Sequence, residues 1–199
     1  NEEFDTSFLK EKNQTITPNG SLYSRDRQGF LPALMEKMYN DRVRYKKMLF
    51  EEQKKGRNAD SNKLSQYFNM QMNLKIALNS AYGALGNEWF RFYDVRNAEA
   101  VSVAGQLSIR WAENEVNKYL NKVLETEDKD YVLASDTDSL YVTLDDLIKK
   151  VGLTDKEKII NFLNTVCENK LEKIIEKCYD NLAVYTNAFQ QKMLMKREV

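Results

Sequence analysis

Hydrophobic positions follow the period of an α-helix over four long segments, which begin near residues 32, 61, 97 and 156. Pro32 suits the start of the first segment, because its missing N–H needs no partner in a first helical turn. The first two segments are similar in length, and a polar break around Gly56 separates them. They are therefore expected to form an antiparallel helical hairpin, whose second helix is ended by Gly83 and Gly86-Asn87.

Shorter β-prone runs at 131–134 and 140–143 flank a polar turn that holds Asp136 and Asp138, which predicts a strand hairpin with two carboxylates at its tip. Asn19-Gly20 predicts a second hairpin in an otherwise irregular N-terminal region, and residues 191–199 read as a further strand. The expected fold class is α+β, with the helical hairpin joined to antiparallel strands packed on helices.

Composition narrows the possible chemistry. The 199 residues are 42% hydrophobic and carry 30 basic and 30 acidic side chains, so a nucleic-acid partner must be met by a local basic patch. There is no histidine, which excludes histidine-dependent triads and zinc sites. No apolar run is long enough for a membrane span, and Cys167 and Cys178 are expected to be reduced thiols in a cytoplasmic protein.

The turn with Asp136 and Asp138 has two readings. Residues two apart in a tight turn can present carboxylates to one hard cation such as Mg²⁺, with substrate phosphates and water completing the site. Aspartate, serine and threonine also favour turns simply because their side chains hydrogen-bond nearby backbone.

The predicted helical hairpin is locally basic. Arg42 falls within the apolar stripe of the first helix, with Lys46 one turn further, and the second helix groups Phe68, Gln71, Lys75, Asn79 and Tyr82 on one face. Such a face could bind a triphosphate, or it could be a solvated surface that binds nothing in particular. The aromatic run at 88–93 is interpreted as core.

The segment Gly83-Ala84-Leu85-Gly86-Asn87, with Trp89-Phe90-Arg91, is similar to the T-even phage branch of family B DNA polymerases, and three further motifs resemble the same family. Lys75-Ile-Ala-Leu-Asn79-Ser80-Ala-Tyr82-Gly83 resembles the motif of the fingers helix. Ser135-Asp136-Thr137-Asp138-Ser139 resembles the acidic hairpin of the palm. Met38-Tyr39-Asn40-Asp41-Arg42 through Lys46 resembles the first fingers helix, and the likeness extends over nearly the whole chain.

The resemblance implies a DNA-directed DNA polymerase that extends a primer on template DNA with deoxynucleoside triphosphates during viral replication, in the host cytoplasm. It implies residues 1–30 as a palm-side segment, 31–83 as fingers and 84–199 as part of the palm. Catalytic roles fall on Asp138, Asp136 and Lys75. The implied ligands of two Mg²⁺ ions are Asp138, Asp136 and Glu198, and the implied nucleotide contacts are Arg42, Lys46, Lys75, Asn79 and Tyr82.

The chain departs from the family pattern in two places, and the second of these departures indicates an incomplete polymerase. Ala134-Ser135 replaces the usual Tyr-Gly, and the Asp-x-x-Ser-Leu-Tyr-Pro motif with the other metal-binding aspartate does not occur. The chain is therefore expected to be a fragment or split subunit that is inactive alone, with other polymerase regions or a second chain supplying the rest. The alternative is a non-catalytic basic helical-hairpin module that docks to a partner.

Overall fold

The computed structural model describes residues 5–136 and 138–197, which divide into two compact units. One unit comprises residues 26–99, and the other comprises residues up to 25 together with those from 100 onward.

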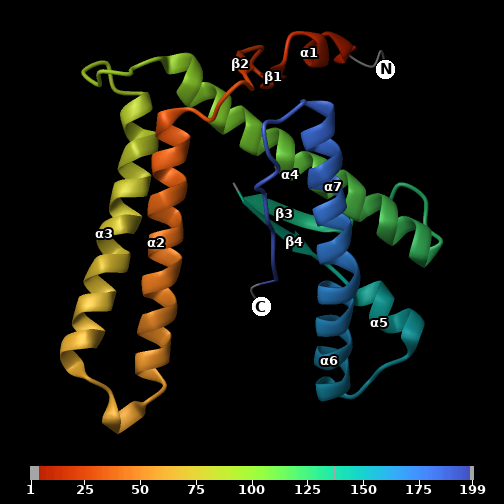
Figure 1. The fold of residues 1–199 in the computed structure, drawn as a ribbon. Helices are drawn as coiled ribbons and strands as arrows, with labels where there is room; N and C mark the ends of the chain where they lie inside the picture. Colours follow the sequence, from red (N-terminus) through yellow and green to blue (C-terminus); the bar gives the residue numbers. More distant parts are fainter. Residues whose placement is uncertain (1–4, 137, 198–199) are drawn as a thin grey trace. The chain divides into compact units, whose positions relative to one another are not determined.

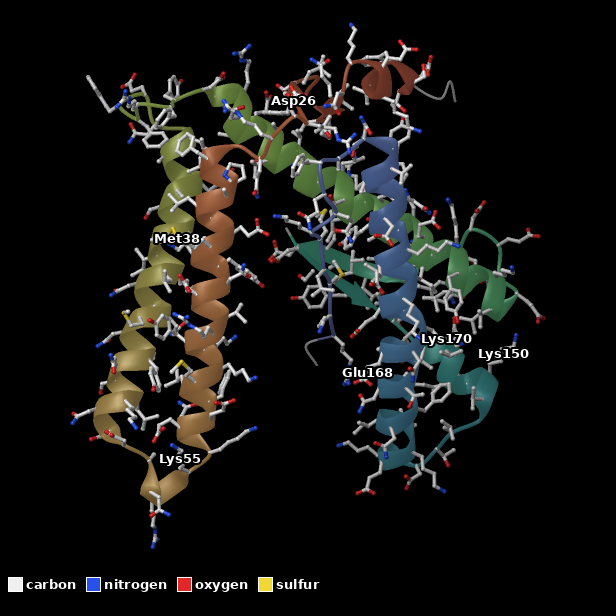
Figure 2. All side chains as sticks on the ribbon, viewed as in Figure 1. Asp26, Met38, Lys55, Lys150, Glu168 and Lys170 are labelled. Carbon is white, nitrogen blue, oxygen red and sulfur yellow. The ribbon has the colours of Figure 1, made fainter. Side chains whose placement is uncertain are left out.

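The unit of residues 26–99 is built on two long helices, α2 (Phe30–Gln53) and α3 (Ser61–Leu85), which run antiparallel and side by side (Figure 1). Tyr45 and Tyr67 mark their contact, with ring centroids 6.4 Å apart. A short 3₁₀ turn, η1 (Gly56–Asn58), connects the helices at the tip, where Lys55 is labelled in Figure 2. Gly56 has a φ of 56°, a backbone conformation that glycine adopts without steric cost.

Two acidic residues hold this tip together. Glu52 is buried, and its carboxylate accepts hydrogen bonds from the Asp60 N–H at 2.9 Å and from the Lys55 ammonium at 2.6 Å. Asp60 is the N-cap of α3 and accepts from the N–H groups of Asn62 and Lys63. Three otherwise unsatisfied donors at the start of α3, the N–H groups of Asp60, Asn62 and Lys63, are thus paired within the tip.

The other unit has its core between helices and a strand hairpin. The long helix α4 (Val95–Leu124), of which residues from 100 onward belong to this unit, contributes Ala112, Val116 and Leu120. The antiparallel strands β3 (Val132–Asp136) and β4 (Ser139–Val142) pair through Asp136 and Ser139 at the turn. The same core cluster contains Tyr131, Val132, Leu171, Ile175, Cys178 and Tyr179 from the hairpin and the C-terminal helices.

Shorter elements complete this unit. The helix α5 (Asp145–Val151) follows the hairpin and carries Lys150, which is labelled in Figure 2. Lys150 donates to the carbonyl of Val123 near the end of α4 at 2.9 Å. The helices α6 (Lys156–Val166) and α7 (Glu172–Tyr185) are joined by a π-helical turn, η2 (Cys167–Leu171). At the N-terminal side lie α1 (Ser7–Glu11), β1 (Gln14–Ile16) and β2 (Leu22–Ser24), with β1 and β2 paired antiparallel.

Asn187, just beyond α7, joins this N-terminal segment to the rest of the unit. Its amide Nδ2 donates to the carbonyls of Leu9 at 3.1 Å and Gln14 at 2.8 Å, and its Oδ1 accepts from the Arg25 guanidinium at 2.9 Å. Its own carbonyl accepts from the Thr15 hydroxyl. With a φ of 50°, Asn187 occupies the left-handed region that asparagine tolerates better than most residues.

The predicted α+β class, the helical hairpin, the Asn19-Gly20 turn and the two free thiols are confirmed. The predicted end of the second helix is correct at Gly86, which caps α3, but not at Gly83, which lies inside it. Two local predictions are wrong: residues 191–197 form no strand, and the N-terminal region contains the helix α1. Within residues 5–136 and 138–197, every helix is too short or too polar to span a membrane.

Candidate functional site

The residues of the helical hairpin that the resemblance implies as nucleotide contacts lie on one flank of the α2–α3 pair. Successive residues turn about 100° around a helix, which places Arg42 and Lys46 about 60° and 100° from Tyr45, the contact point on α2. On α3, Lys75 and Asn79 lie about 80° and 120° from Tyr67 in the same rotational sense. Because the helices are antiparallel, rotation in the same sense from their contact leads to the same side of the pair. We call the side that carries Arg42, Lys46, Lys75, Asn79 and Tyr82 the cationic flank.

The order of these residues along the flank follows from the helical rise of about 1.5 Å per residue. With Tyr45 level with Tyr67, Arg42 and Lys75 differ by only about 7.5 Å along the hairpin axis. Asn79 and Tyr82 lie further toward the base of the hairpin. The cations therefore occupy the tip side of the flank, and an amide and an aromatic ring occupy its base side.

Arg42 sits at the border between the packed and open sides of α2. It is half-buried, and its Nε is shielded from solvent without a hydrogen-bond partner among the described residues. A buried guanidinium donor without a partner is costly, and an anion would satisfy it. Lys46 is exposed and lies over the ring of Phe50 at 5.8 Å.

The sequence analysis grouped five residues of α3 on one open face, and the exposure of their side chains agrees for four of them and not for the fifth. Phe68, Lys75, Asn79 and Tyr82 are exposed at the spacing of successive turns. Gln71 is buried, at 9% exposure, and belongs to the packed side. The error arises because Gln71 lies only about 40° from Lys75 around the helix, a difference that spacing alone does not resolve.

The acidic hairpin lies in the other unit. Asp136 is the last residue of β3 and Asp138 lies in the turn, and both are exposed. Across the turn, the Ser139 hydroxyl donates to the carbonyl of Asp136 at 3.2 Å. Ala134 and Ser135, the positions that depart from the family pattern, pair with Tyr141 and Leu140 in the ladder. Glu198 lies outside the described residues.

The hairpin carboxylates suit a hard divalent cation, but only as part of a larger ligand set. In the part of the chain that the structure describes, no three acidic or thiol side chains gather closely enough to hold a metal ion. Mg²⁺ commonly binds through one or two carboxylates and takes its other ligands from substrate phosphates and water. Asp136 and Asp138 fit such a substrate-completed site and not a closed protein cage.

The aromatic segment between α3 and α4 is the main feature that sequence reasoning misread. Trp89 is 88% exposed, and Phe92 and Tyr93 are nearly half exposed, so this run is largely surface and not core. Phe92 is braced by the ring of Phe30 at 4.8 Å and lies under the guanidinium of Arg91 at 5.8 Å. The signal available in the sequence was the flanking Gly86-Asn87 and Asp94, which are typical of a loop.

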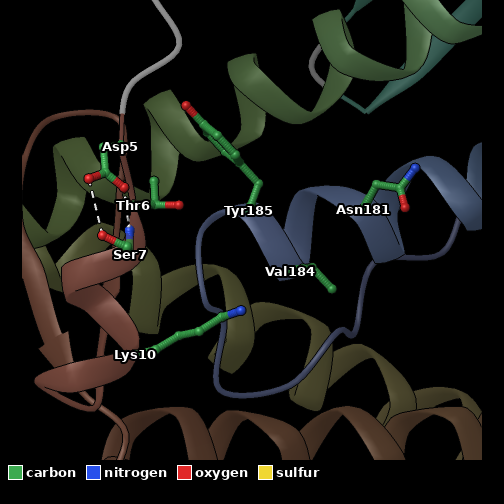
Figure 3. A pocket seen from close by; sticks show the side chains of 7 residues that line it. All are labelled: Asp5, Thr6, Ser7, Lys10, Asn181, Val184 and Tyr185. Carbon is green, nitrogen blue, oxygen red and sulfur yellow. Dashed lines mark hydrogen bonds between the residues drawn. The ribbon is translucent and has the colours of Figure 1, made fainter.

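A surface pocket in the unit of residues up to 25 and from 100 onward lies where α1 faces the end of α7 (Figure 3). On its rim, Asp5 accepts from the Ser7 N–H at 2.9 Å, a hydrogen bond that holds the pKa of Asp5 below its ordinary value. None of the predicted site residues lines it. The complete lining is Asp5, Thr6, Ser7, Lys10, Asn181, Val184 and Tyr185.

The predicted site residues thus form two sets, a cationic flank in one unit and an acidic hairpin in the other. Comparison with known proteins connects both sets to one family, because the sequence profile of DNA polymerase family B matches residues 2–197. The chain belongs to this family. The resemblance of the three motifs to family B is therefore confirmed.

Phage enzymes are among the relatives of this family B chain. It is 34% identical to the DNA-directed DNA polymerase of Enterobacteria phage T4 and 31% identical to that of Escherichia phage RB69, each over 92% of this chain and 26% of the relative. The DNA polymerase delta catalytic subunit of Candida albicans is 28% identical over 86% of this chain and 16% of the relative. The chain therefore spans about a quarter of the length of the phage relatives that it matches.

Both phage alignments extend over 232 positions, more than the 199 residues of this chain. The phage polymerases therefore contain residues in this region that have no counterpart here.

Proposed function

We propose that this chain is the fingers and part of the palm of a DNA-directed DNA polymerase that extends a primer 3′-end with deoxynucleotides. In this proposal residues 31–83 are the fingers, residues 84–199 contribute part of the palm, and residues 1–30 are a palm-side segment. The two phage relatives support a role in viral DNA replication in the host cytoplasm.

The observation that carries the proposal is the cationic flank. Arg42 and Lys75 lie within reach of one elongated anion, and Arg42 has an unmet buried donor. Arginine suits two-pronged contact with phosphate oxygens, and lysine provides a compact charge. We assign the triphosphate of the incoming nucleotide to Arg42, Lys46 and Lys75, and its base to the surface of Asn79 and Tyr82.

The acidic hairpin would supply the other half of the chemistry. Asp138, supported by Asp136 and joined by Glu198, would hold divalent cations, for which we propose Mg²⁺. Such ions stabilise the attacking and leaving oxygens of an in-line displacement. The primer 3′-oxygen forms a bond to the α-phosphorus as the bond to pyrophosphate breaks, and Arg42, Lys46 and Lys75 neutralise charge on the departing pyrophosphate.

The aromatic segment supports a DNA partner. An exposed indole such as Trp89 offers a stacking face to an unpaired base, and Arg91, which lies over the ring of Phe92, adds positive charge to the same segment. We propose that this segment contacts primer-template DNA.

Nucleotide binding by the chain tests the proposal directly. Titration with a deoxynucleoside triphosphate at low ionic strength should show weak, salt-sensitive binding that Lys75→Ala lowers about tenfold, the effect of one charge-assisted hydrogen bond. Lys37→Ala is the matched control, because Lys37 is exposed on α2 about 80° from Tyr45 in the opposite sense. Equal affinities for both variants would contradict the assignment of the cationic flank.

Primer extension separates the polymerase proposal from the alternative of a non-catalytic docking module. With Mg²⁺, primer-template and nucleotides, we expect no incorporation by this chain alone and incorporation once the remaining polymerase regions are present. Robust incorporation by the chain alone would refute the incomplete-site proposal. No gain on adding those regions, with partner binding indifferent to Asp138→Asn and Lys75→Ala, would favour the docking module.

A further inference from the structure

Two asparagines one turn apart on α4 hydrogen-bond the segment that leads into β3. Asn121 binds both backbone groups of Lys129: its Nδ2 donates to the carbonyl at 2.7 Å, and its Oδ1 accepts from the N–H at 3.0 Å. Asn117 accepts from the N–H of Tyr131 through Oδ1 at 2.9 Å. The asparagine side chains thus bind the backbone of the alternate residues Lys129 and Tyr131, as a neighbouring strand would do.

Further hydrogen bonds join the asparagines to the first residue of the strand. The Nδ2 of Asn117 donates to the Asp130 carboxylate at 2.9 Å, and the same carboxylate oxygen accepts from the N–H of Val132 at 2.9 Å. The Thr126 hydroxyl lies 2.7 Å from Asn121 Oδ1 and 2.8 Å from the phenol oxygen of Tyr131. Since Tyr131 is only 1% exposed, this network fixes a core residue as well as the strand.

The position of this segment decides which way the acidic residues point. Side chains alternate along a strand, so a slip of one residue would turn Asp136 to the face that Ser135 now occupies. Within the described residues β3 pairs only with β4, and a two-stranded hairpin holds its register weakly. The ladder already shifts between Val132 and Ala134, so its own pairing does not enforce a uniform register.

We propose that Asn117 and Asn121 are positioning residues that set the register of β3 and thereby aim the carboxylates of Asp136 and Asp138. They touch neither carboxylate and act through the backbone of residues 129–132. The part of this inference that concerns a cation rests on the proposed function; the part that concerns the register does not.

The first experiment removes one hydrogen-bond partner without weakening the helix. Asn117→Ala places the best helix former at this position, so α4 itself should remain intact. By NMR, the amide of Tyr131 should lose roughly tenfold in exchange protection, and the cross-strand contact between Asp136 and Ser139 should weaken or move. The matched control is Asn114→Ala, an exposed asparagine on the same helix. Wild-type protection and register in Asn117→Ala would overturn the proposal.

A reciprocal exchange remains informative even where the alanine variant does not fold. Asn117→Asp alone would place two carboxylates in contact and should disturb the register. Combining it with Asp130→Asn removes the contact between like charges and keeps an acceptor at position 117 for the Tyr131 N–H. The double variant should therefore recover the exchange protection of the Tyr131 amide, and a double variant that behaves like Asn117→Asp alone would overturn the proposal.

The response of the hairpin to Mn²⁺ distinguishes a positioning residue from a purely structural one, because a purely structural role of Asn117 would leave this response unchanged. Broadening of the amide signals of the hairpin should require roughly tenfold more Mn²⁺ in Asn117→Ala, the usual scale for residues that orient metal ligands. This difference should vanish in an Asp138→Asn background, because the effect acts through that carboxylate. A register change without a change in Mn²⁺ response would reduce Asn117 to a structural role. If Mn²⁺ does not broaden the wild-type hairpin, the proposed cation site fails, while the exchange data still decide whether Asn117 sets the register.

Discussion

Replacement of Asn187 by alanine should destabilise the unit that contains it by about 4.5 kcal/mol. The change removes two hydrogen bonds to the carbonyls of Leu9 and Gln14, worth about 1 kcal/mol each, and one from the charged Arg25, worth about 1.5 kcal/mol at this half-buried position. It also places alanine at a φ of 50°, which costs about 1 kcal/mol. The bond from Thr15 to the backbone carbonyl of residue 187 is retained.

Asn187→Gly separates these contributions, because glycine loses the same hydrogen bonds but adopts this φ freely. We expect it to be about 1 kcal/mol more stable than the alanine variant. Urea unfolding can be followed by the fluorescence of Trp111, whose ring lies 5.6 Å from that of Tyr185 in the same unit, in a Trp89→Phe background. Alanine and glycine variants within about 0.5 kcal/mol of the wild-type chain, the range of ordinary surface substitutions, would refute the reasoning.

Three further predictions follow from exposure and from pKa. Trp89→Ala should weaken single-stranded DNA binding about tenfold in fluorescence anisotropy, since stacking of one base contributes about 1–3 kcal/mol; unchanged affinity would exclude a stacking role. The hydrogen bond from Asp60 N–H, with a smaller contribution from Lys55, lowers the pKa of Glu52, so the tip should keep full stability above the ordinary carboxyl range and lose it as pH falls through the lowered pKa. The protection of the Asp60 amide should show this acid dependence, and Glu52→Gln should abolish it. Burial raises the pKa of Cys178 to about 11, so at pH 8 iodoacetamide should label this thiol about a hundredfold more slowly than a thiol of pKa 9. The stability that the protonated thiol of Cys178 contributes should be present below pH 9 and lost as pH rises toward 11. Rapid labelling of Cys178 in the folded chain would contradict its burial.

The long helices were predictable because their signals are local and repeated. A period of 3.6 residues sustained over more than twenty positions identified α2, α3 and α4, and turn residues marked their separation. The five residues of α1 and the seven of α5 are too few to establish a period. For α5, the end signals were nevertheless available: aspartates in its first turn, lysines in its last, and Gly152 beyond it at a φ of 75°.

The predicted strand at the end of the chain shows how alternation can mislead. Met195 packs against the core and the Sδ of Met193 accepts from the Ser108 hydroxyl, so two methionines at alternate positions do contact the protein. A strand also needs a neighbour for its backbone, and here the N–H of Arg197 donates to the Glu172 carboxylate instead. The pattern predicted the contacts of the side chains but could not reveal the absence of a paired strand in residues 191–197.

For the candidate site too, residues whose neighbours are close in the sequence could be predicted, and residues whose partners are distant in the sequence could not. Lys75, Asn79 and Tyr82 could be grouped from spacing because they share one helix, whereas the role of Asn187 depends on partners as far as 178 residues away in the sequence. Asn117 and Asn121 fall between these cases. They adjoin Val116 and Leu120, which are almost completely buried, and two amides one turn apart beside a buried face need partners from another segment. That requirement could be read from the sequence of α4, but the identity of the partners as the backbone of the acidic hairpin could not, because only the fold brings residues 129 and 131 to that face.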